Sequence, residues 1–184
     1  MGEIIAPEIF RLQSGGIEAM ISTAGAWVEG LRLNTGTETI DLFAPKREFE
    51  VDGWKKSRGG MHVCLPNFDP ADESLGLAQH GFGRVLTWEI TSIDDASVTM
   101  VLDTNKHKLD VPSNYLGLVA EVVYSTEDNE NGLVVLNSKL TMTNNSGANM
   151  PWAVGFHPYF ASNGDNESNL VVYSHGHEPQ EFDK

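Results

Sequence analysis

The sequence predicts an all-β fold of the sandwich or barrel-like type. Three observations support this prediction: apolar and polar residues alternate over much of the chain, the apolar runs are short, and turn residues separate these runs at close intervals. No stretch repeats its apolar residues at helical spacing, and no internal repeat is present. A succession of strands at this spacing is typical of an all-β domain with two packed sheets or a closed barrel.

We expect strands, written by residue number in chain order, at 18–22, 27–33, 39–43, 85–93, 97–103, 118–125, 132–144 and 170–173. The first two form a pair joined by the glycine-containing turn 23–26, and residues 34–37 form the next turn. The acidic segment 126–131 suits a hairpin loop. A polar turn at 144–149 precedes the segment 150–157.

Residues 45–79 are the exception to this pattern. They form a long segment rich in Gly, Pro and charge, which predicts an irregular loop. Long loops in compact domains often carry function.

Length and charge limit the kinds of partner that we expect. The 184 residues favour one domain, spanning 1–184. Lys and Arg number 12 against 26 Asp and Glu, a formal net charge of -14, which repels nucleic acid and anionic membrane surfaces. One small anion remains an expected ligand if a few cations converge, and the candidates are Lys55, Lys56, Arg58 and Arg84.

Cys64 is the only cysteine, so no intramolecular disulfide forms, and we expect a buried thiol in a reducing compartment. The N-terminus lacks a basic region followed by a long apolar one, and no stretch reaches the roughly 18 apolar residues of a membrane span. These features predict a cytoplasmic protein.

Two short motifs place an imidazole among aromatic residues and glycines. In the first, Gly81 and Gly83 let backbone and ligand approach closely, and His80 and Arg84 share a cleft if Arg84 begins a strand. The alternative is a turn histidine beside a solvated arginine. Trp88 fits either the core or the face of a sugar ring.

The second motif surrounds His157 with apolar residues. Such surroundings favour a neutral imidazole that exchanges one proton near neutral pH, as a general acid requires. The alternative is a core histidine bonded to a backbone carbonyl. In an extended segment at most one of Tyr159 and Phe160 shares the side of His157. His62 and His107 have no recognisable partners in the sequence.

Other chemistries lack their usual signatures. His175 and His177 flank a glycine, but without cysteine or carboxylate spacing they favour a solvated tail over a metal site. The sequence has no Walker-type loop, no Gly-x-Gly-x-x-Gly and no Gly-x-Ser-x-Gly. We therefore assign no metal ligands.

Four motifs, taken in order, resemble the aldose 1-epimerase (mutarotase) family, and among its branches the glucose-6-phosphate 1-epimerases (hexose-6-phosphate mutarotases). They are Ser57-Arg58-Gly59-Gly60, Cys64-Leu65-Pro66-Asn67-Phe68, Gln79-His80-Gly81-Phe82-Gly83-Arg84 and Gly155-Phe156-His157-Pro158-Tyr159-Phe160. The resemblance runs from about Glu18 to Phe160.

The resemblance implies a β-supersandwich of the galactose mutarotase-like type and the interconversion of α and β anomers of an aldose, without a metal or an organic cofactor. By position, His157 matches the acid that protonates the ring oxygen, and His80 matches a substrate-binding histidine. Arg58 and Arg84 match arginines that contact the sugar or its phosphate, where a guanidinium makes bidentate bonds.

The chain also departs from the family pattern. The family's general base is a glutamate on a strand well downstream of His157, and Glu167, Glu178 and Glu181 do not match its setting, so the base is unknown. Met61-His62 replaces the small or proline residues usual after Arg-Gly-Gly. We therefore weigh three readings: a mutarotase whose C-terminal strands are missing, which we favour; a non-catalytic sugar-binding β-domain; and a short enzyme with another base. A purely structural interaction module would neither bind nor convert a sugar.

Overall fold

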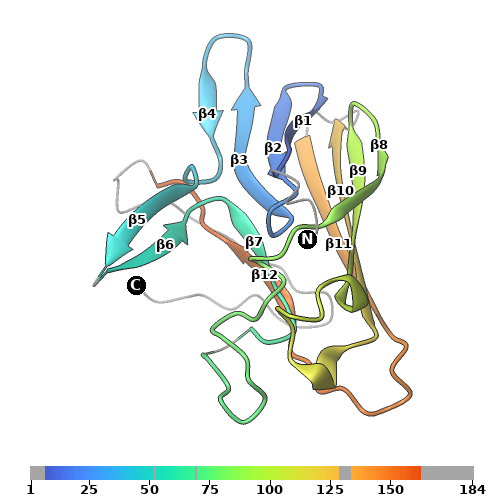
Figure 1. Cartoon of the computed structure of the whole chain (residues 1–184). Coiled ribbons are helices and arrows are strands. Elements are labelled where there is room, and N and C mark those ends of the chain that lie inside the picture. The colour runs from blue at the N-terminus through green and yellow to red at the C-terminus, as the bar shows by residue number, and fades with distance from the viewer. Residues whose placement is uncertain (1–6, 52, 69, 129–133, 163–184) are drawn as a thin grey trace, which may run out of the picture.

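The computed structural model describes residues 7–51, 53–68, 70–128 and 134–162, and within them the regular secondary structure is almost entirely β-strand (Figure 1). The first sheet has the order β1 (Ile9–Ser14), β2 (Ile17–Ser22), β3 (Trp27–Asn34), β7 (Met61–Cys64) and β12 (Gly155–Pro158), with β4 (Thr39–Asp41) beside β3. The second has the order β11 (Val134–Asn144), β10 (Leu118–Asp128), β9 (Ser97–Asp103) and β8 (Glu89–Ile93). A separate hairpin pairs β5 (Arg47–Val51) with β6 (Trp54–Arg58), and two 3-10 turns, η1 (Thr104–Lys106) and η2 (Ser113–Tyr115), precede β10. The predicted all-β class is confirmed.

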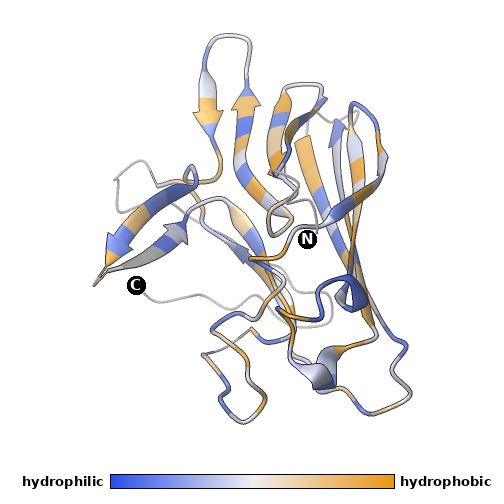
Figure 2. Ribbon diagram, viewed as in Figure 1, coloured by the Kyte–Doolittle hydropathy of each residue, from blue (hydrophilic) through white to orange (hydrophobic). Residues whose placement is uncertain are grey.

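The core lies between the two larger sheets, because alternate residues of their strands are apolar. On β9 the buried residues are Val98, Met100 and Leu102, each separated by a less buried neighbour. Figure 2 shows the corresponding alternation of apolar and polar bands along the strands. The Tyr124 hydroxyl on β10 donates to the carbonyl of Ala26 at 2.8 Å, and this buried hydrogen bond ties the second sheet to the turn between β2 and β3.

The strongly alternating strands match the prediction, and the irregular regions do not. The segment predicted as a loop at 45–79 contains β5, β6 and β7, and β1 was not predicted. The strand predicted at 85–93 begins only at Glu89, because residues 83–85 form a turn. The strand predicted at 170–173 and the histidines at 175 and 177 lie outside the described residues.

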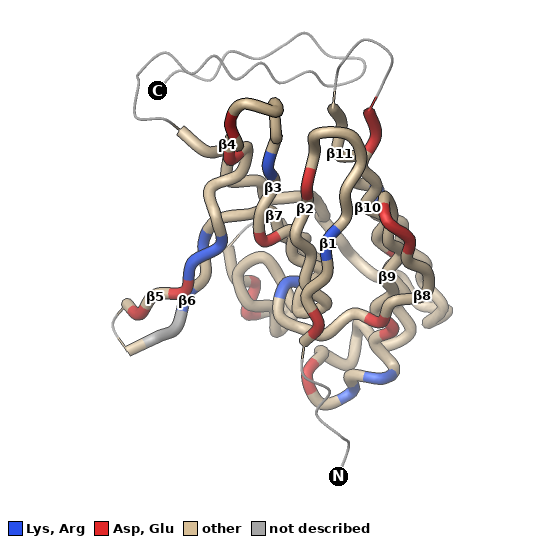
Figure 3. The backbone as a smooth tube through the Cα atoms, turned by 90° about the horizontal axis from the view of Figure 1, so that it is seen from above, with Lys and Arg blue, Asp and Glu red and all other residues tan. Residues whose placement is uncertain are grey.

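Acidic residues are spread over the strands and loops, and Lys and Arg gather along β5 and β6 (Figure 3). Cys64 is fully buried and unpaired, as predicted. Trp88 belongs to the core, where its indole N–H donates to the carbonyl of Gly83 at 2.9 Å. Within the described residues, no helix has the length and apolar character needed to cross a membrane.

Candidate functional site

Two histidines face each other where β12 joins the first sheet. His157 on β12 is the register partner of His62 on β7 in an antiparallel pair. Directly opposed residues of such a pair project from the same face of the sheet. The two imidazoles are nearly parallel, with ring centroids 5.0 Å apart and an interplanar angle of 22°. The pairing of two short strands therefore creates a stacked pair of imidazoles.

Tyr159 is the residue that shares the side of His157. Its ring stacks on the His157 imidazole, with centroids 4.8 Å apart and an angle of 21°. Phe160 packs instead against Phe43 in an edge contact with centroids 5.6 Å apart. The backbone N–H of Tyr159 donates to the Gly60 carbonyl at 2.8 Å, which holds this end of the segment in place. The expectation that only one of the two rings shares the side of His157 is confirmed.

The loop that carries the third histidine is fastened to Leu65, just after β7. Leu65 N–H donates to the His80 carbonyl at 3.2 Å, and Gly83 N–H donates to the Leu65 carbonyl at 2.9 Å. Gly81 has a φ of +69°, and a Cβ atom at this position would overlap the Leu65 carbonyl oxygen. Glycine is needed here both for its backbone angle and for the close approach.

His80 itself adopts the left-handed backbone region, with a φ of +61°. This conformation is uncommon for a residue with a side chain and is concentrated at functional sites. The His80 Nδ1 donates to the backbone carbonyl of Phe68. Because a carbonyl oxygen only accepts, Nδ1 carries a proton, and in the corresponding neutral tautomer Nε2 holds the lone pair. The ring meets the His157 imidazole edge to face, with centroids 5.1 Å apart.

His62 is a site residue that the sequence analysis did not identify. It is fully buried, and its ring contacts those of Trp27, His80 and Tyr159 as well as His157, with centroid distances of 4.7, 5.5, 6.3 and 5.0 Å. All four residues of β7 are buried, so the strand lacks the alternation that reveals a strand in sequence. The one available signal was its place in the same extended segment as Arg58-Gly59-Gly60.

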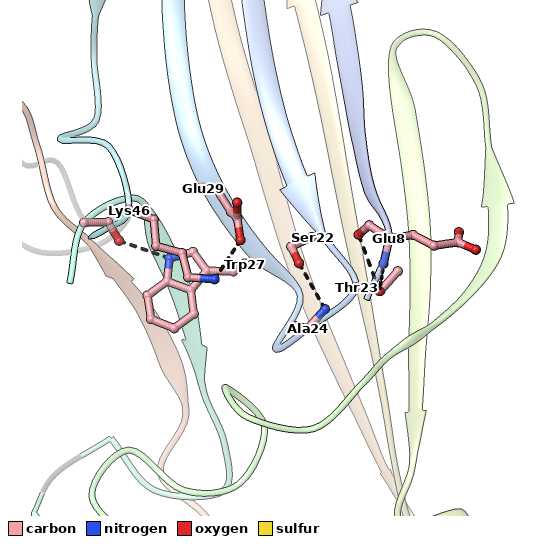
Figure 4. Close-up of polar contacts among 8 residues, drawn as sticks. Glu8, Ser22, Thr23, Ala24, Trp27, Glu29 and Lys46 are labelled. Carbon is pink, nitrogen blue, oxygen red and sulfur yellow. Dashed lines mark hydrogen bonds and ion pairs between the residues drawn. The ribbon is translucent and has the colours of Figure 1, made fainter. Parts of the chain in front are cut away.

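Arg84 lies in a turn rather than at the start of a strand. The predicted strand start at residue 85 was wrong, because the backbone N–H groups of Val85 and Leu86 both donate to the Phe82 carbonyl and close a turn there. The Arg84 guanidinium is half-buried and lies 5.3 Å from the centre of the Trp27 ring. Trp27 is fixed by a hydrogen bond in which its indole N–H donates to the Gly59 carbonyl at 3.0 Å (Figure 4). Lys46 also packs on Trp27, and its ammonium group pairs with Glu29 at 2.6 Å.

Burial and positive charge both lower the pKa values of His62 and His157. Burial is the main cause that lowers the pKa of His62 to about 3, and Arg84 adds to the effect. Burial also lowers the pKa of His157, followed by the influence of His80 and Arg84. The pKa of Arg84 is lowered by burial as well. Near neutral pH the site therefore combines the neutral imidazoles of His62 and His157 with one partly buried cation, Arg84.

Arg58 lies outside the contacts of the histidine cluster. It is exposed on β6, its guanidinium is 5.4 Å from the centre of the Phe49 ring, and it stands opposite Arg47 in the hairpin. Both arginines line a cavity of about 530 Å³ that reaches Tyr159. Arg84 lines a different cavity, of about 580 Å³, together with Trp27, Gln79 and Ser57. His80 and His157 thus contact each other, Arg84 packs on Trp27 and Arg58 shares a cavity with Tyr159, so the four predicted site residues do not form one contact cluster.

The arrangement can exchange protons at two imidazoles and bind an anion at Arg84. Among the residues that the structure describes, no carboxylate forms an ion pair with an imidazole of the cluster or with Arg84. No group of three or more His, Cys, Asp or Glu in the described part of the chain has a geometry that could hold a metal ion. None of the described residues is assigned as the general base.

Comparisons with known proteins bear on the family and the fold of the chain. The family model for aldose 1-epimerase matches residues 8–180. A galactose mutarotase-like protein from Lactobacillus casei superimposes with a TM-score of 0.62 at 21% identity, over 83% of this chain and 50% of its own. A galactose mutarotase related enzyme from Lactobacillus acidophilus gives 0.60 at 20% identity, over 88% of this chain and 52% of its own. These likenesses show the fold, and the chain spans about half the length of either structure. No curated protein matches the sequence significantly.

Proposed function

The chain belongs to the aldose 1-epimerase family, and from this premise we propose that it acts as a carbohydrate mutarotase, an isomerase that interconverts the α and β anomers of an aldose. The observation that carries the proposal is the edge-to-face contact of His80 and His157 beside the partly buried Arg84. Two imidazoles at this separation can each form a hydrogen bond with one of two neighbouring oxygen atoms of a small ligand. The reaction needs no metal and no organic cofactor.

In the proposed mechanism, His157 in its protonated form is the general acid. It gives a proton to the ring oxygen as the bond between C1 and that oxygen breaks, and a base removes the proton of the C1 hydroxyl, so that C1 becomes a carbonyl. Rotation about the C1–C2 bond and ring closure then give the other anomer. We do not assign the base to a described residue.

His80 is the proposed substrate-binding histidine. Its Nδ1 proton is engaged by the Phe68 carbonyl, so Nε2 is the atom that faces a ligand as an acceptor when the ring is neutral. A sugar hydroxyl is a suitable donor for it. The same carbonyl bond fixes the ring orientation, which keeps the acceptor directed while the sugar ring opens.

A hexose 6-phosphate is the proposed substrate. A half-buried guanidinium without a carboxylate partner among the described residues favours an anionic ligand, and Arg84 is such a group. Arg58 is the alternative proposed phosphate contact, because it and Arg47 place two cations on opposite strands, with no described acidic partner, at the separate cavity that reaches Tyr159. The single cysteine leads us to propose the cytoplasm as the location.

Exchange spectroscopy by NMR tests the activity directly. Saturation of the C1 proton of one anomer of glucose 6-phosphate should transfer to the other anomer faster with the protein than in buffer. Glucose and galactose are the matched neutral substrates, and we expect weaker acceleration for both. No acceleration with any of the three sugars would contradict the proposed activity.

Calorimetry on the same samples distinguishes the rival function, a sugar-binding β-domain without catalysis. Saturable binding of glucose 6-phosphate without anomer exchange would support that rival. Neither binding nor exchange would support an interaction module. Equal rates for glucose and glucose 6-phosphate would keep the mutarotase proposal and remove the phosphate preference.

A further inference from the structure

His62 occupies the centre of the aromatic cluster, and the hydrogen bonds that its ring makes with the described residues are long. Its Nδ1 lies 3.4 Å from the Val63 carbonyl oxygen and 3.7 Å from the Cys64 sulfur, both long contacts. Its Nε2 is buried and has no hydrogen-bond partner among the described residues. Packing against neighbouring rings therefore sets the plane of this imidazole more than hydrogen bonding does.

The rings on either side of His62 belong to different parts of the site. Trp27 on β3 contacts it at 4.7 Å between centroids, and Trp27 is itself fixed by the 3.0 Å bond to Gly59. His157 on β12 stacks on it at 5.0 Å and 22°. The fixed indole, the buried imidazole and the proposed acid therefore follow one another across three neighbouring strands, β3, β7 and β12.

We propose that His62 is a positioning residue that fixes the ring plane of His157 through the stacked contact between β7 and β12. The inference rests on the proposed mutarotase function, in which His157 must direct a proton at the ring oxygen. His62 is fully buried, so it acts through His157 and does not itself touch the sugar. Its neutral state avoids placing a second charge against His157 when that ring is protonated.

Two substitutions separate the ring plane from simple core filling. His62→Leu keeps an apolar side chain of similar volume without a flat ring, and His62→Phe keeps a flat ring without nitrogen atoms. Neither leaves a new buried polar atom. The control is Phe160→Leu, which removes a ring contact near the same strand, where Phe160 is 49% exposed and packs on Phe43.

Loss of the ring in His62→Leu should lower kcat for anomer exchange by about tenfold to a hundredfold, because a small misplacement of a reacting group has effects of this size. KM should change by less than about twofold, since substrate contacts are kept. His62→Phe should restore kcat to within about threefold of the parent, and Phe160→Leu should leave it unchanged. The ring proton signals of His157 should shift in His62→Leu and far less in His62→Phe, because only the first loses the stacked ring.

A folded leucine variant with parental kcat and unchanged His157 signals would overturn the proposal. So would a folded phenylalanine variant that loses as much activity as the leucine variant, because the nitrogen atoms would then be responsible. His62→Val replaces the leucine variant if that one does not fold. If the parent protein shows no anomer exchange, the proposed function fails, whereas the His157 ring signals still test the stacked contact.

Discussion

The imidazoles of His80 and His157 meet edge to face, with their centroids 5.1 Å apart, although one lies in a turn after β7 and the other on β12. The His80 ring is fixed by the Phe68 carbonyl, and the His157 ring is fixed by stacked neighbours. The two histidines are therefore held by different kinds of interaction. This difference makes their proposed roles separable by mutation.

Removal of the proposed acid should abolish most of the activity. His157→Ala deletes the proton donor, and general acid catalysis contributes about 10²–10⁴-fold in rate. We expect kcat for anomer exchange, measured by NMR saturation transfer, to decrease by a factor within that range. His107→Ala is the control, because His107 lies after η1 and contacts none of the rings in the cluster. An unchanged rate in His157→Ala would refute the assigned role.

Replacement of Arg84 should weaken binding of the phosphorylated sugar selectively. Arg84→Gln removes the charge, and charge-assisted bonds contribute about 1.5–3 kcal/mol. KM for glucose 6-phosphate should rise by about tenfold to a hundredfold, whereas kinetics with glucose should change little. Arg32→Gln is the matched control, since Arg32 is exposed and paired with Asp41 at 2.9 Å. Equal losses on both sugars would argue against phosphate binding at Arg84.

Acid should destabilise the fold in part through His62. Its folded pKa is about 3 against an ordinary value of 6.5, so the unfolded chain binds the proton more readily between these values. The contribution of the neutral His62 to the free energy of unfolding is therefore fully present above about pH 6.5 and is lost as the pH falls toward the folded pKa. The loss between pH 7.5 and pH 4.5 is on the order of 2–3 kcal/mol for this residue.

Urea unfolding at these two pH values measures that dependence. His62→Leu should reduce the difference in unfolding free energy between pH 7.5 and pH 4.5 by roughly the amount attributed to His62. His157 contributes with the same sign, because its pKa is also lowered, and it remains in the variant. An identical pH dependence in parent and variant would mean that His62 is not buried in its neutral form.

The glycine next to His80 should be intolerant of substitution. Gly81→Ala adds a Cβ atom that would overlap the Leu65 carbonyl oxygen, in addition to the strain at a φ of +69°. Gly36→Ala provides the control, because Gly36 has a φ of +87° and open space around its Cβ position. Left-handed strain alone costs about 1–2 kcal/mol. In urea unfolding, Gly81→Ala should lower the free energy of unfolding by more than that amount. Equal losses in Gly81→Ala and Gly36→Ala would show that the Leu65 contact adds nothing.

The strands of the second sheet could be predicted from sequence because β9 and β10 alternate strictly between buried and less buried residues. The strands within residues 45–79 could not be predicted from the sequence. There β7 is buried at every position and is only four residues long, whereas β5 is mostly exposed. Neither strand has the half-buried alternation that marks a strand, because one lies in the interior and the other projects from the fold.

The candidate site was only partly visible in the sequence. His80, His157, Arg58 and Arg84 were identified from ordered motifs, but their local composition left core or solvated explanations open. His62 was missed because its role depends on the register between β7 and β12, which joins distant parts of the chain. Register of this kind is a tertiary property that residue spacing does not contain.

Arg84 lines the cavity of about 580 Å³ and is also one of the causes that lower the pKa of His157. An anion that pairs with this guanidinium offsets its positive field, and the proton affinity of His157 rises in response. A phosphorylated sugar bound there would thus bring the acid closer to its protonated form on arrival. In that case the ligand takes part in setting the strength of the group that acts on it, and an unphosphorylated sugar meets a less readily protonated imidazole.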